Sequence, residues 1–238
     1  MQHKGYGKLY LIPNFLSVEN PNNFLADYVR DSVKHIKKFI VESEKGGRAL
    51  IKKLGTDVPL PEAELFLLNE HSNKNETYKL LEILQNGCDA AIISDAGLPC
   101  VADPGCDLVA LAQQKQIEVI PLPGASSIFM ALMASGFSGQ SFVFYGYLPI
   151  DKPLRAKKIK EMEKDAITKN QSQIFMEAPY RNNQLLEDIL KNVAATTKIC
   201  IACHISSPES WIKTKSAKEW MLQKPELHKK PVIFVMGA

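Results

Sequence analysis

Residues 90–105, AAIISDAGLPCVADPG, decide the fold. The apolar run at 90–94 has the length and composition of a buried strand, and a dense run of turn-forming residues follows it directly. Open α/β sheets collect ligands at the carboxyl ends of their strands. There, Gly97 and Gly105 would let the backbone approach a bound molecule, and Asp95 could accept hydrogen bonds from hydroxyl or amine groups. A plain turn with two helix-capping aspartates is the alternative.

The rest of the chain repeats this alternation of short apolar runs and longer amphipathic stretches. The pattern predicts an α/β protein with largely parallel sheets. The predicted strands are residues 8–12, 35–41, 65–68, 90–94, 118–122, 142–145, 173–177, 198–203 and 231–236. The predicted helices are residues 76–84, 104–113, 126–135 and 181–193, with another that begins near Pro153.

A second cluster of turn residues, at 121–124, marks the predicted boundary between two domains, 1–121 and 122–238. Before residue 120 there are 13 basic and 16 acidic residues, and after it 16 and 10, so the second half is basic. Ser126 and Ser127 begin the next predicted helix, where free N–H groups and hydroxyls could hold a polar ligand or where Ser126 or Ser127 could simply cap the helix. We expect the domains to pack against each other, with a ligand cleft between them.

Composition excludes several classes of protein. The chain has 238 residues, of which 45% are hydrophobic and 23% charged, which is typical of a globular protein. It has no apolar run of the roughly 18 to 20 residues needed to cross a bilayer, and residues 1–10 lack the apolar core of a signal peptide. We therefore expect a cytoplasmic protein with reduced cysteines and no membrane partner. The absence of a P-loop and of a G-x-G-x-x-G sequence disfavours nucleotide triphosphate and NAD binding.

Six ordered segments resemble the tetrapyrrole methylase superfamily of S-adenosylmethionine (SAM) dependent, class III methyltransferases. The resemblance is greatest to its branch of small-subunit ribosomal RNA cytidine 2′-O-methyltransferases. The segments are 94–105, 121–136 (PLPGASSIFMALMASG), 145–155 (YGYLPIDKPLR), 174–181 (IFMEAPYR), 200–209 and 230–237. Residues 11–15 (LIPNF) lack the glycine of that branch's first loop, and 203–207 (CHISS) replace a charged motif. The methyl acceptor therefore stays open.

The resemblance implies two αβα domains with SAM bound in the cleft between them, S-adenosylhomocysteine as the product, and a homodimer. It implies ribose 2′-O-methylation during ribosomal RNA processing, with ribosomal RNA or a small-subunit particle as partner. A tetrapyrrole or another small molecule is the alternative acceptor, and a non-catalytic SAM-binding protein is the alternative class. The positions that the resemblance assigns to SAM binding are Pro13, Asp95, Gly97, Ser126, Ser127, Met176, Ile205 and Pro231.

No catalytic residue is assigned. Methyl transfer mainly requires the nucleophile, methyl carbon and sulfur to be held in line, although a ribose hydroxyl must also lose its proton. Glu177 and His204 are the candidate bases, and for Glu177 an ion pair with Arg181 is the competing interpretation.

Two further patterns are open to more than one interpretation. Residues 200–204 (CIACH) match the C-x-x-C-H haem-attachment pattern, but they fall on a predicted buried strand, so we expect neither haem nor a metal site. A basic run near the helix at Pro153 is either a solvated face or a guide for RNA phosphates. Its residues are Lys152, Arg155, Lys157, Lys158, Lys160 and Lys164.

Overall fold

The computed structural model describes residues 5–17 and 25–237, which form two compact units. The main division falls between Ala125 and Ser126, whereas the sequence placed it between 121 and 122. The intervening residues stay with the first unit because Leu122 N donates a hydrogen bond to Leu11 O at 3.0 Å. Gly124 also packs so closely on Pro13 that an added Cβ would lie 2.1 Å from the proline Cβ.

The first unit contains a five-stranded parallel sheet in the order β3-β2-β4-β1-β5. Its strands are β1 (Leu9–Ile12), β2 (Lys38–Val41), β3 (Glu64–Leu67), β4 (Ala90–Ile93) and β5 (Val119–Pro121). Its α-helices are α1 (Asp27–Val33), α2 (Glu44–Leu54), α3 (Lys74–Gln85) and α4 (Cys106–Gln114), with a 3₁₀ turn at Leu60–Glu62. The parallel arrangement predicted from the sequence is confirmed for this unit.

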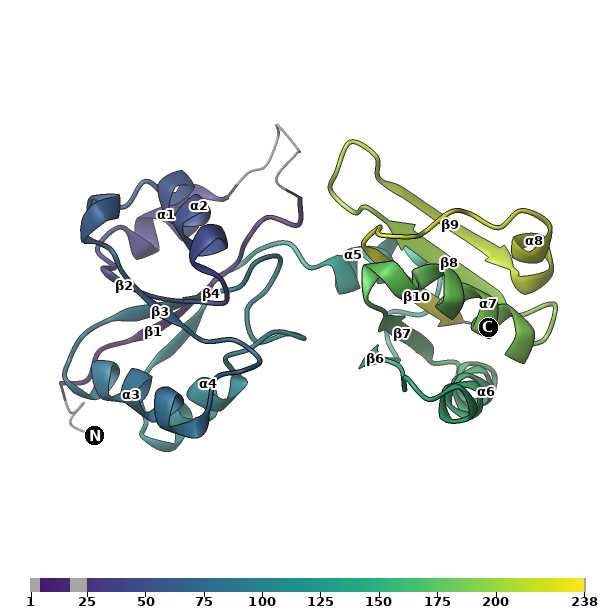
Figure 1. Cartoon of the computed structure of the whole chain (residues 1–238), viewed down its shortest axis with the longest axis horizontal. Helices are drawn as coiled ribbons and strands as arrows, with labels where there is room; N and C mark the ends of the chain where they lie inside the picture. Colours follow the sequence, from purple (N-terminus) through teal and green to yellow (C-terminus); the bar gives the residue numbers. More distant parts are fainter. Residues whose placement is uncertain (1–4, 18–24, 238) are drawn as a thin grey trace. The chain divides into compact units, whose positions relative to one another are not determined.

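Alternation along the strands supplies both faces of this sheet with apolar side chains. Ile12 and Phe39 pack with helices α1 and α2, while Leu9 and Ile40 pack with α3 and α4. Figure 1 shows the two helix pairs on opposite sides of the sheet. Burial on both faces explains why these strands are apolar at nearly every position.

The second unit has a mixed sheet in the order β6-β7-β10-β8-β9. Its strands are β6 (Phe142–Tyr147), β7 (Ser172–Met176), β8 (Lys198–Cys203), β9 (Trp211–Ser216) and β10 (Val232–Gly237). Its α-helices are α5 (Ser127–Ser135), α6 (Lys152–Lys169), α7 (Asn182–Asn192) and α8 (Ala217–Leu222), with a 3₁₀ turn at Pro179–Arg181. Only β6 and β7 are parallel, so the expectation of a largely parallel sheet is wrong here.

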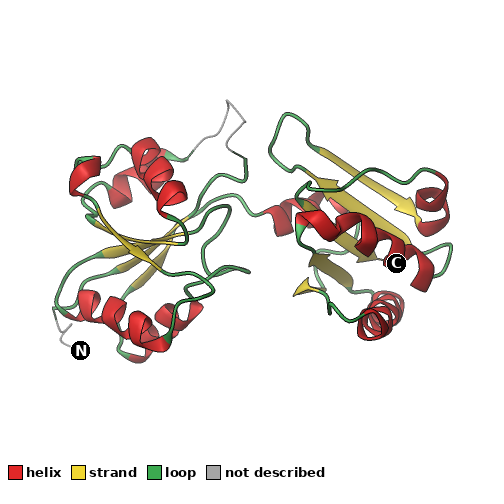
Figure 2. Ribbon diagram, viewed as in Figure 1, coloured by secondary structure: helices red, strands yellow, loops and turns green. Residues whose placement is uncertain are grey.

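Helices also cover both faces of the second sheet. Residues of α6, α7 and α8, among them Met162, Leu186 and Trp220, pack with Phe175 and Phe234 on one face. Helix α5 packs against strands β7, β8, β9 and β10. Figure 2 shows the strands of this unit in yellow with its helices in red around them. Each unit is therefore a helix–sheet–helix sandwich, as expected for the α/β fold.

The prediction missed α1, α2, α8 and β9. Strand β9 lies at one edge of the second sheet. It carries Lys213 and Lys215, so its apolar pattern is weak. Polar residues are common on edge strands because they discourage pairing with other chains. Within the described residues, no helix combines the length and the apolar character needed to cross a membrane.

Candidate functional site

The first cluster of candidate residues lies at the carboxyl edge of the parallel sheet. Because parallel strands end at the same edge, the loops after β1, β2 and β4 meet there. They bring Asn14, Glu42, Ser43 and Asp95 into one hydrogen-bonded group. Of these four residues, only Asp95 was predicted from the sequence to bind a ligand.

Asn14 joins the loop after β1 to the loop after β4. Its backbone pairs with Gly97 in both directions, with N···O distances of 2.7 and 3.2 Å. Its side-chain Nδ2 donates to the carbonyl oxygens of Ser94 at 2.9 Å and Asp95 at 3.1 Å. Its Oδ1 accepts from Phe15 N at 2.8 Å. The backbone and Nδ2 of this buried residue thus set the path of the loop that carries Asp95, while its Oδ1 orders its own loop.

Asp95 itself is exposed and is oriented by the start of α2. Its Oδ1 accepts from Ser43 Oγ at 2.7 Å, and its N donates to Glu42 Oε2 at 3.1 Å. Ser43 also caps α2 by accepting from Gly46 N at 3.1 Å. A side chain at Gly46 would displace the Asp95 carboxylate, because its Cβ would lie 2.3 Å from Asp95 Oδ1. The carboxylate is thereby held beside the positive end of a helix dipole, which stabilises its charge.

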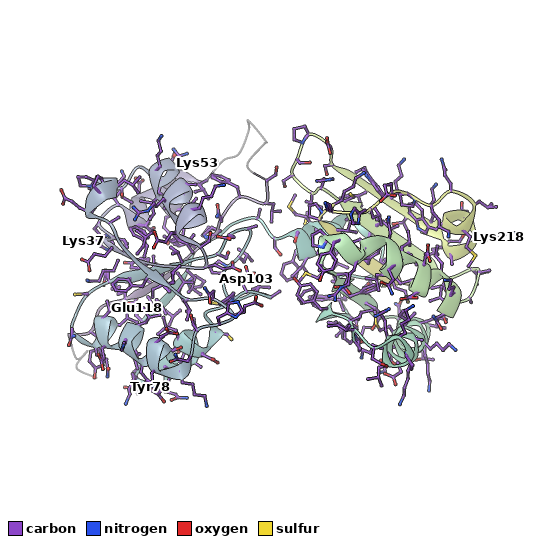
Figure 3. All side chains as sticks on the ribbon, in the orientation of Figure 1. Lys37, Lys53, Tyr78, Asp103, Glu118 and Lys218 are labelled. Atoms are coloured by element: carbon purple, nitrogen blue, oxygen red, sulfur yellow. The ribbon has the colours of Figure 1, made fainter. Side chains whose placement is uncertain are left out.

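Asp103 adds another carboxyl group to this edge. Burial, together with the negative charges of Glu42 and Asp95, raises the pKa of Asp103 to about 6, while a hydrogen bond from Ser94 opposes the shift. Figure 3 shows Asp103 away from Lys37, which precedes β2 at the amino end of the sheet. Carboxylates gathered in this way suit a ligand that carries hydroxyl or ammonium groups.

The other predicted residues of this unit support the loops from within. Gly97 is buried with φ +72°, a backbone conformation that most side chains disfavour, and an added Cβ would meet Leu16 at 3.2 Å. Pro13 is buried against Gly124. The structure brings Pro13, Asp95 and Gly97 to the same edge, with only Asp95 offering an exposed polar side chain.

In the second unit, Ser126 and Ser127 lie at the start of α5. Ser126 occupies the N-cap position with extended backbone angles, but its hydroxyl makes no capping hydrogen bond. The capping interpretation is therefore correct for the position of Ser126 and wrong for its hydroxyl. The N–H groups of the first turn have no side-chain cap from Ser126, which leaves them available to a polar group.

Met176, Ile205 and Pro231 meet at one edge of the second sheet. Met176, at the end of β7, pairs with Ile233 on β10, and Pro231 O accepts from His204 N at 3.0 Å. Ile205 lies between two non-glycine residues with left-handed backbones, His204 at φ 52° and Ser206 at φ 66°. Such conformations are strained and gather at functional sites. Each unit thus brings its own set of predicted positions together.

The two candidate bases differ in their availability. Glu177 Oε1 accepts from Arg181 Nη2 at 2.6 Å and from Ala178 N at 2.7 Å, and the Glu177 side chain is 2% exposed. The ion-pair interpretation of Glu177 is confirmed. His204 keeps a partly exposed ring, 3.8 Å from Glu209 Oε2.

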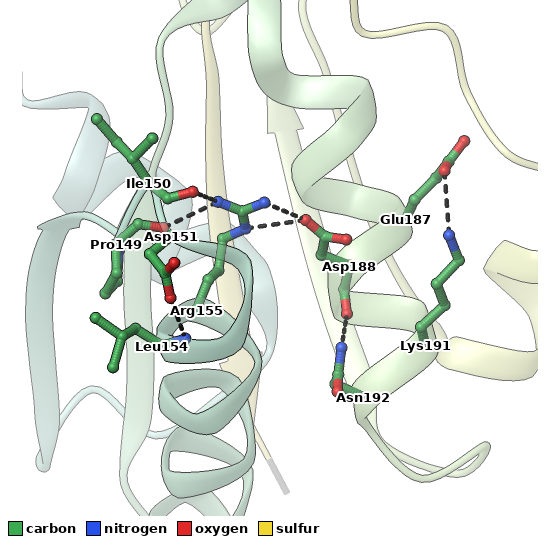
Figure 4. A network of polar contacts seen from close by, with 9 residues as sticks. All are labelled: Pro149, Ile150, Asp151, Leu154, Arg155, Glu187, Asp188, Lys191 and Asn192. Atoms are coloured by element: carbon green, nitrogen blue, oxygen red, sulfur yellow. Dashed lines mark hydrogen bonds and ion pairs between the residues drawn. The ribbon is translucent and has the colours of Figure 1, made fainter.

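Arg155 does not belong to the basic surface of α6. Its guanidinium donates to Asp188 Oδ2 at 2.9 and 2.6 Å and to the carbonyl oxygens of Pro149 and Ile150, as Figure 4 shows. The Arg155 side chain is 6% exposed. The assignment of Arg155 to an RNA-guiding run is therefore wrong, because its guanidinium is buried and bound by Asp188 and two backbone carbonyl groups. Lys158 is also partly covered, with Nζ 4.1 Å from the ring centre of Tyr145.

The C-x-x-C-H segment lies on and just after β8. Cys200 and Cys203 are buried, and burial raises the pKa of both thiols. Within residues 5–17 and 25–237, no group of three His, Cys, Asp or Glu side chains could hold a metal ion.

The sequence and the fold both resemble those of known proteins. The sequence model of the tetrapyrrole (corrin/porphyrin) methylases matches residues 25–219. The chain belongs to this family. A ribosomal RNA small subunit methyltransferase I from Pasteurella multocida is 32% identical to this protein over 72% of the chain and 60% of the relative. The chain spans about 60% of the length of the curated relatives that it matches first.

Solved structures show the same fold. The methyltransferase CobJ has a TM-score of 0.65 at 15% identity, covering 97% of this chain and 94% of CobJ. A uroporphyrin-III C-methyltransferase from Thermus thermophilus, complexed with S-adenosylhomocysteine, has a TM-score of 0.55 at 14% identity, with 97% of both chains covered. At these identities the likeness concerns the fold.

Proposed function

We propose that this protein is a SAM-dependent methyltransferase that methylates ribosomal RNA, at a ribose 2′-oxygen. The proposal rests mainly on the pairing of two loops through Asn14 and Gly97. This pairing holds the Asp95 carboxylate at the carboxyl edge of the first sheet. The family and the relatives named as ribosomal RNA small subunit methyltransferases support the same activity.

The described residues fit the chemical groups of SAM. Asp95 could accept hydrogen bonds from hydroxyl or ammonium groups, and the first turn of α5 offers N–H donors to a carboxylate. Met176, Ile205 and Pro231 would supply apolar contacts and backbone groups. When bound, SAM would supply a methyl group that is already electrophilic. The protein's own task is then to position the acceptor oxygen and to exclude competing water.

The proton of a ribose hydroxyl needs an acceptor. Glu177 is engaged by Arg181 and is nearly inaccessible, which leaves His204 as the candidate base. His204, whose backbone is left-handed, directly precedes Ile205, one of the predicted SAM positions. A tetrapyrrole acceptor, which the family name favours, would place different demands on this group. A non-catalytic SAM-binding role would place none.

Calorimetry with SAM and with S-adenosylhomocysteine tests the proposed cofactor site. We expect the wild type to bind both, and we expect Asp95→Ala and Ser126→Ala to bind them at least several-fold more weakly, because each removes a polar partner. Asp107→Ala is the matched control, since Asp107 is an exposed aspartate on α4. A folded wild-type protein that binds neither molecule would contradict the proposal.

Tritiated methyl transfer then identifies the acceptor. Undermodified small ribosomal subunits, total RNA and tetrapyrrole precursors are compared with the same enzyme preparation. The labelled RNA is then hydrolysed with alkali, a cleavage that needs a free 2′-hydroxyl. Label recovered in a dinucleotide that alkali does not cleave would support ribose 2′-O-methylation. Label in a tetrapyrrole would support the alternative acceptor, and SAM binding without any methyl transfer would support the non-catalytic role.

We further propose the homodimer that the family resemblance implies. Apolar side chains remain exposed on the second unit, including Phe129 at 46% and Met133 at 83% on α5. Large exposed apolar side chains of this kind commonly mark an interface. Light scattering on the full chain tests the dimer, and a monomeric mass at micromolar concentration would contradict it.

A further inference from the structure

A pocket of about 430 Å³ lies on the second unit, between β9 and the segment that follows α8. Its lining combines two tryptophans with four lysines. They are Trp211, Lys213, Lys215, Trp220, Lys224 and Lys230. None of them was selected from the sequence as a functional residue.

The strand period explains how the basic wall forms. Trp211, Lys213 and Lys215 occupy alternate positions of β9, so their side chains share one face of the sheet. Trp220, from α8, lies behind them with its ring centre 6.4 Å from that of Trp211. Trp220 is buried, and its Nε1 donates to Ile199 O at 2.9 Å. The tryptophans therefore form an apolar floor beside the cationic side chains, and Lys215 lies over the Trp220 ring.

The positive charge of this pocket is only partly balanced from within. Within the described residues, no ion pair of 4.0 Å or less involves Lys213, Lys215, Lys224 or Lys230. Residues 211–230 contain six lysines and two glutamates. Glu226 also lines the pocket, and its Oε1 accepts from His228 N at 2.7 Å and from Asn183 Nδ2 at 2.6 Å. These contacts lower its pKa and favour the carboxylate, so the pocket sets one carboxylate against four lysines.

Protection of an edge strand does not account for this arrangement. Lysines on β9 alone would serve to discourage edge-to-edge pairing. Lys224 and Lys230 lie outside β9, in the segments after α8 and before β10, yet they line the same pocket. Convergence of lysines from separate segments on one hollow is instead what an anionic ligand requires.

The register of the sheet connects the pocket to the predicted cofactor positions. Trp211 pairs with Cys203, and Cys203 pairs with Val232, the neighbour of Pro231. The pocket therefore begins at the sheet edge that carries Ile205 and Pro231 and follows β9 toward Lys215. Four residues of strand span about 13 Å, which suits an extended chain of phosphates better than a single ion.

We propose that this pocket binds backbone phosphates of the RNA substrate, to one side of the methylated nucleotide. The proposal rests on the proposed function, because it takes RNA to be the methyl acceptor. Lysines read phosphate as point charges without regard to base sequence, so the pocket adds affinity and orientation while the cofactor edge selects the target. An acidic protein segment is the competing occupant.

The variant Lys213→Gln/Lys224→Gln tests the pocket. Both side chains are exposed. Within the described residues, neither ammonium group makes a cation–π contact with a tryptophan, unlike that of Lys215, whose Nζ lies 4.9 Å from the Trp220 ring centre. Binding of a short, fluorescein-labelled, unstructured RNA is measured by anisotropy over a range of salt concentrations. Each phosphate contact in single-stranded nucleic acid contributes about 0.7 to the slope of log K against log salt. We expect the slope to shrink by about 1.4 and the affinity at low salt to fall several-fold.

Two matched variants separate the pocket from general charge effects. Lys79→Gln/Lys115→Gln removes the same charge from exposed positions of the first unit and should leave the slope unchanged. Lys213→Arg/Lys224→Arg keeps the charge and should retain binding. An unchanged slope in the pocket variant, or an equal loss in the first-unit variant, would overturn the proposal.

Further measurements distinguish failure of this inference from failure of the proposed function. SAM binding is measured by calorimetry on the same proteins, and loss of RNA binding with SAM binding intact would locate the defect in the pocket. If the wild type binds no SAM, the proposed function fails, whereas the RNA slope still tests the pocket. Tighter, lysine-dependent binding of polyglutamate than of RNA would overturn the proposal in favour of a protein partner.

Discussion

Asn14 joins two loops that are separated by 80 residues in the sequence. Its amide spans the start of the loop after β4, and its backbone pairs with Gly97. From the sequence alone, an asparagine after a proline indicates a turn and no more. Only the adjacency of β1 and β4 gives this residue its role, because parallel pairing places both strand ends at one edge.

Asp103 shows how this edge responds to pH. Its folded-state pKa of about 6 lies above the usual value of 3.8. Above pH 6 both states are ionised and the folded protein carries the unfavourable carboxylate. As pH falls through 6 the folded state takes up a proton first, so this residue destabilises the fold least below pH 4.

We therefore expect Asp103→Asn to raise the melting temperature at pH 7.5, with the gain shrinking below pH 6 and vanishing near pH 4. Melting curves across this range measure the effect. Asp107→Asn, at an exposed position on α4, provides the comparison. The same difference between Asp103→Asn and the wild type at every pH would contradict the explanation.

At the scale of elements, Arg155 fastens α6 to α7. Figure 4 shows it reaching from α6 to Asp188, whose side chain is 20% exposed. Two carbonyl oxygens between β6 and α6 take its remaining Nη1 hydrogen bonds. The basic run in the sequence could not reveal this inward orientation, because a charged residue on an amphipathic helix usually faces solvent.

Removing one partner of a buried pair leaves a charge without compensation, which costs about 3 kcal/mol. We expect Arg155→Met to lower the free energy of unfolding by about this amount, with Arg155→Met/Asp188→Leu recovering much of the loss. Urea unfolding provides the measurement. Lys157→Met, at an exposed position of the same helix, should change stability by less than about 0.5 kcal/mol. Full additivity of the single Arg155 and Asp188 effects would show that the pair is not coupled.

At the scale of the whole molecule, the predicted SAM positions come from both units. Pro13, Asp95 and Gly97 belong to the first unit, while Ser126 and the four remaining positions belong to the second. A ligand that needs groups from both units stabilises both of them against unfolding. The charge asymmetry follows the same division, since the acidic half carries the proposed cofactor carboxylate and the basic half the proposed RNA pocket.

Scanning calorimetry of the full chain tests whether the ligand uses groups from both units. At a concentration of S-adenosylhomocysteine about 100 times its dissociation constant, we expect a stabilisation of about 2.7 kcal/mol. Any separate transitions of the two units should both move to higher temperature. Asp95→Ala should reduce the shift and Asp107→Ala should not. Movement of only one of two transitions would show that a single unit holds the ligand.

The sequence by itself determined the α/β class, most of the strands and helices, and the family resemblance. Those features are local, since hydrophobic period, turn residues and contiguous motifs are written in neighbouring positions. The short helices α1 and α8 and the lysine-bearing strand β9 escaped prediction because their local patterns are weak.

Only the tertiary structure decided the mixed, largely antiparallel arrangement of the second sheet and the Asn14–Gly97 pairing. It also decided that Arg155 points inward and that lysines from separate segments meet beside two tryptophans. Each depends on residues from separate segments whose adjacency follows from strand order and packing. A one-dimensional pattern shows which side chains share a face of an element, but it does not show which other element lies opposite that face.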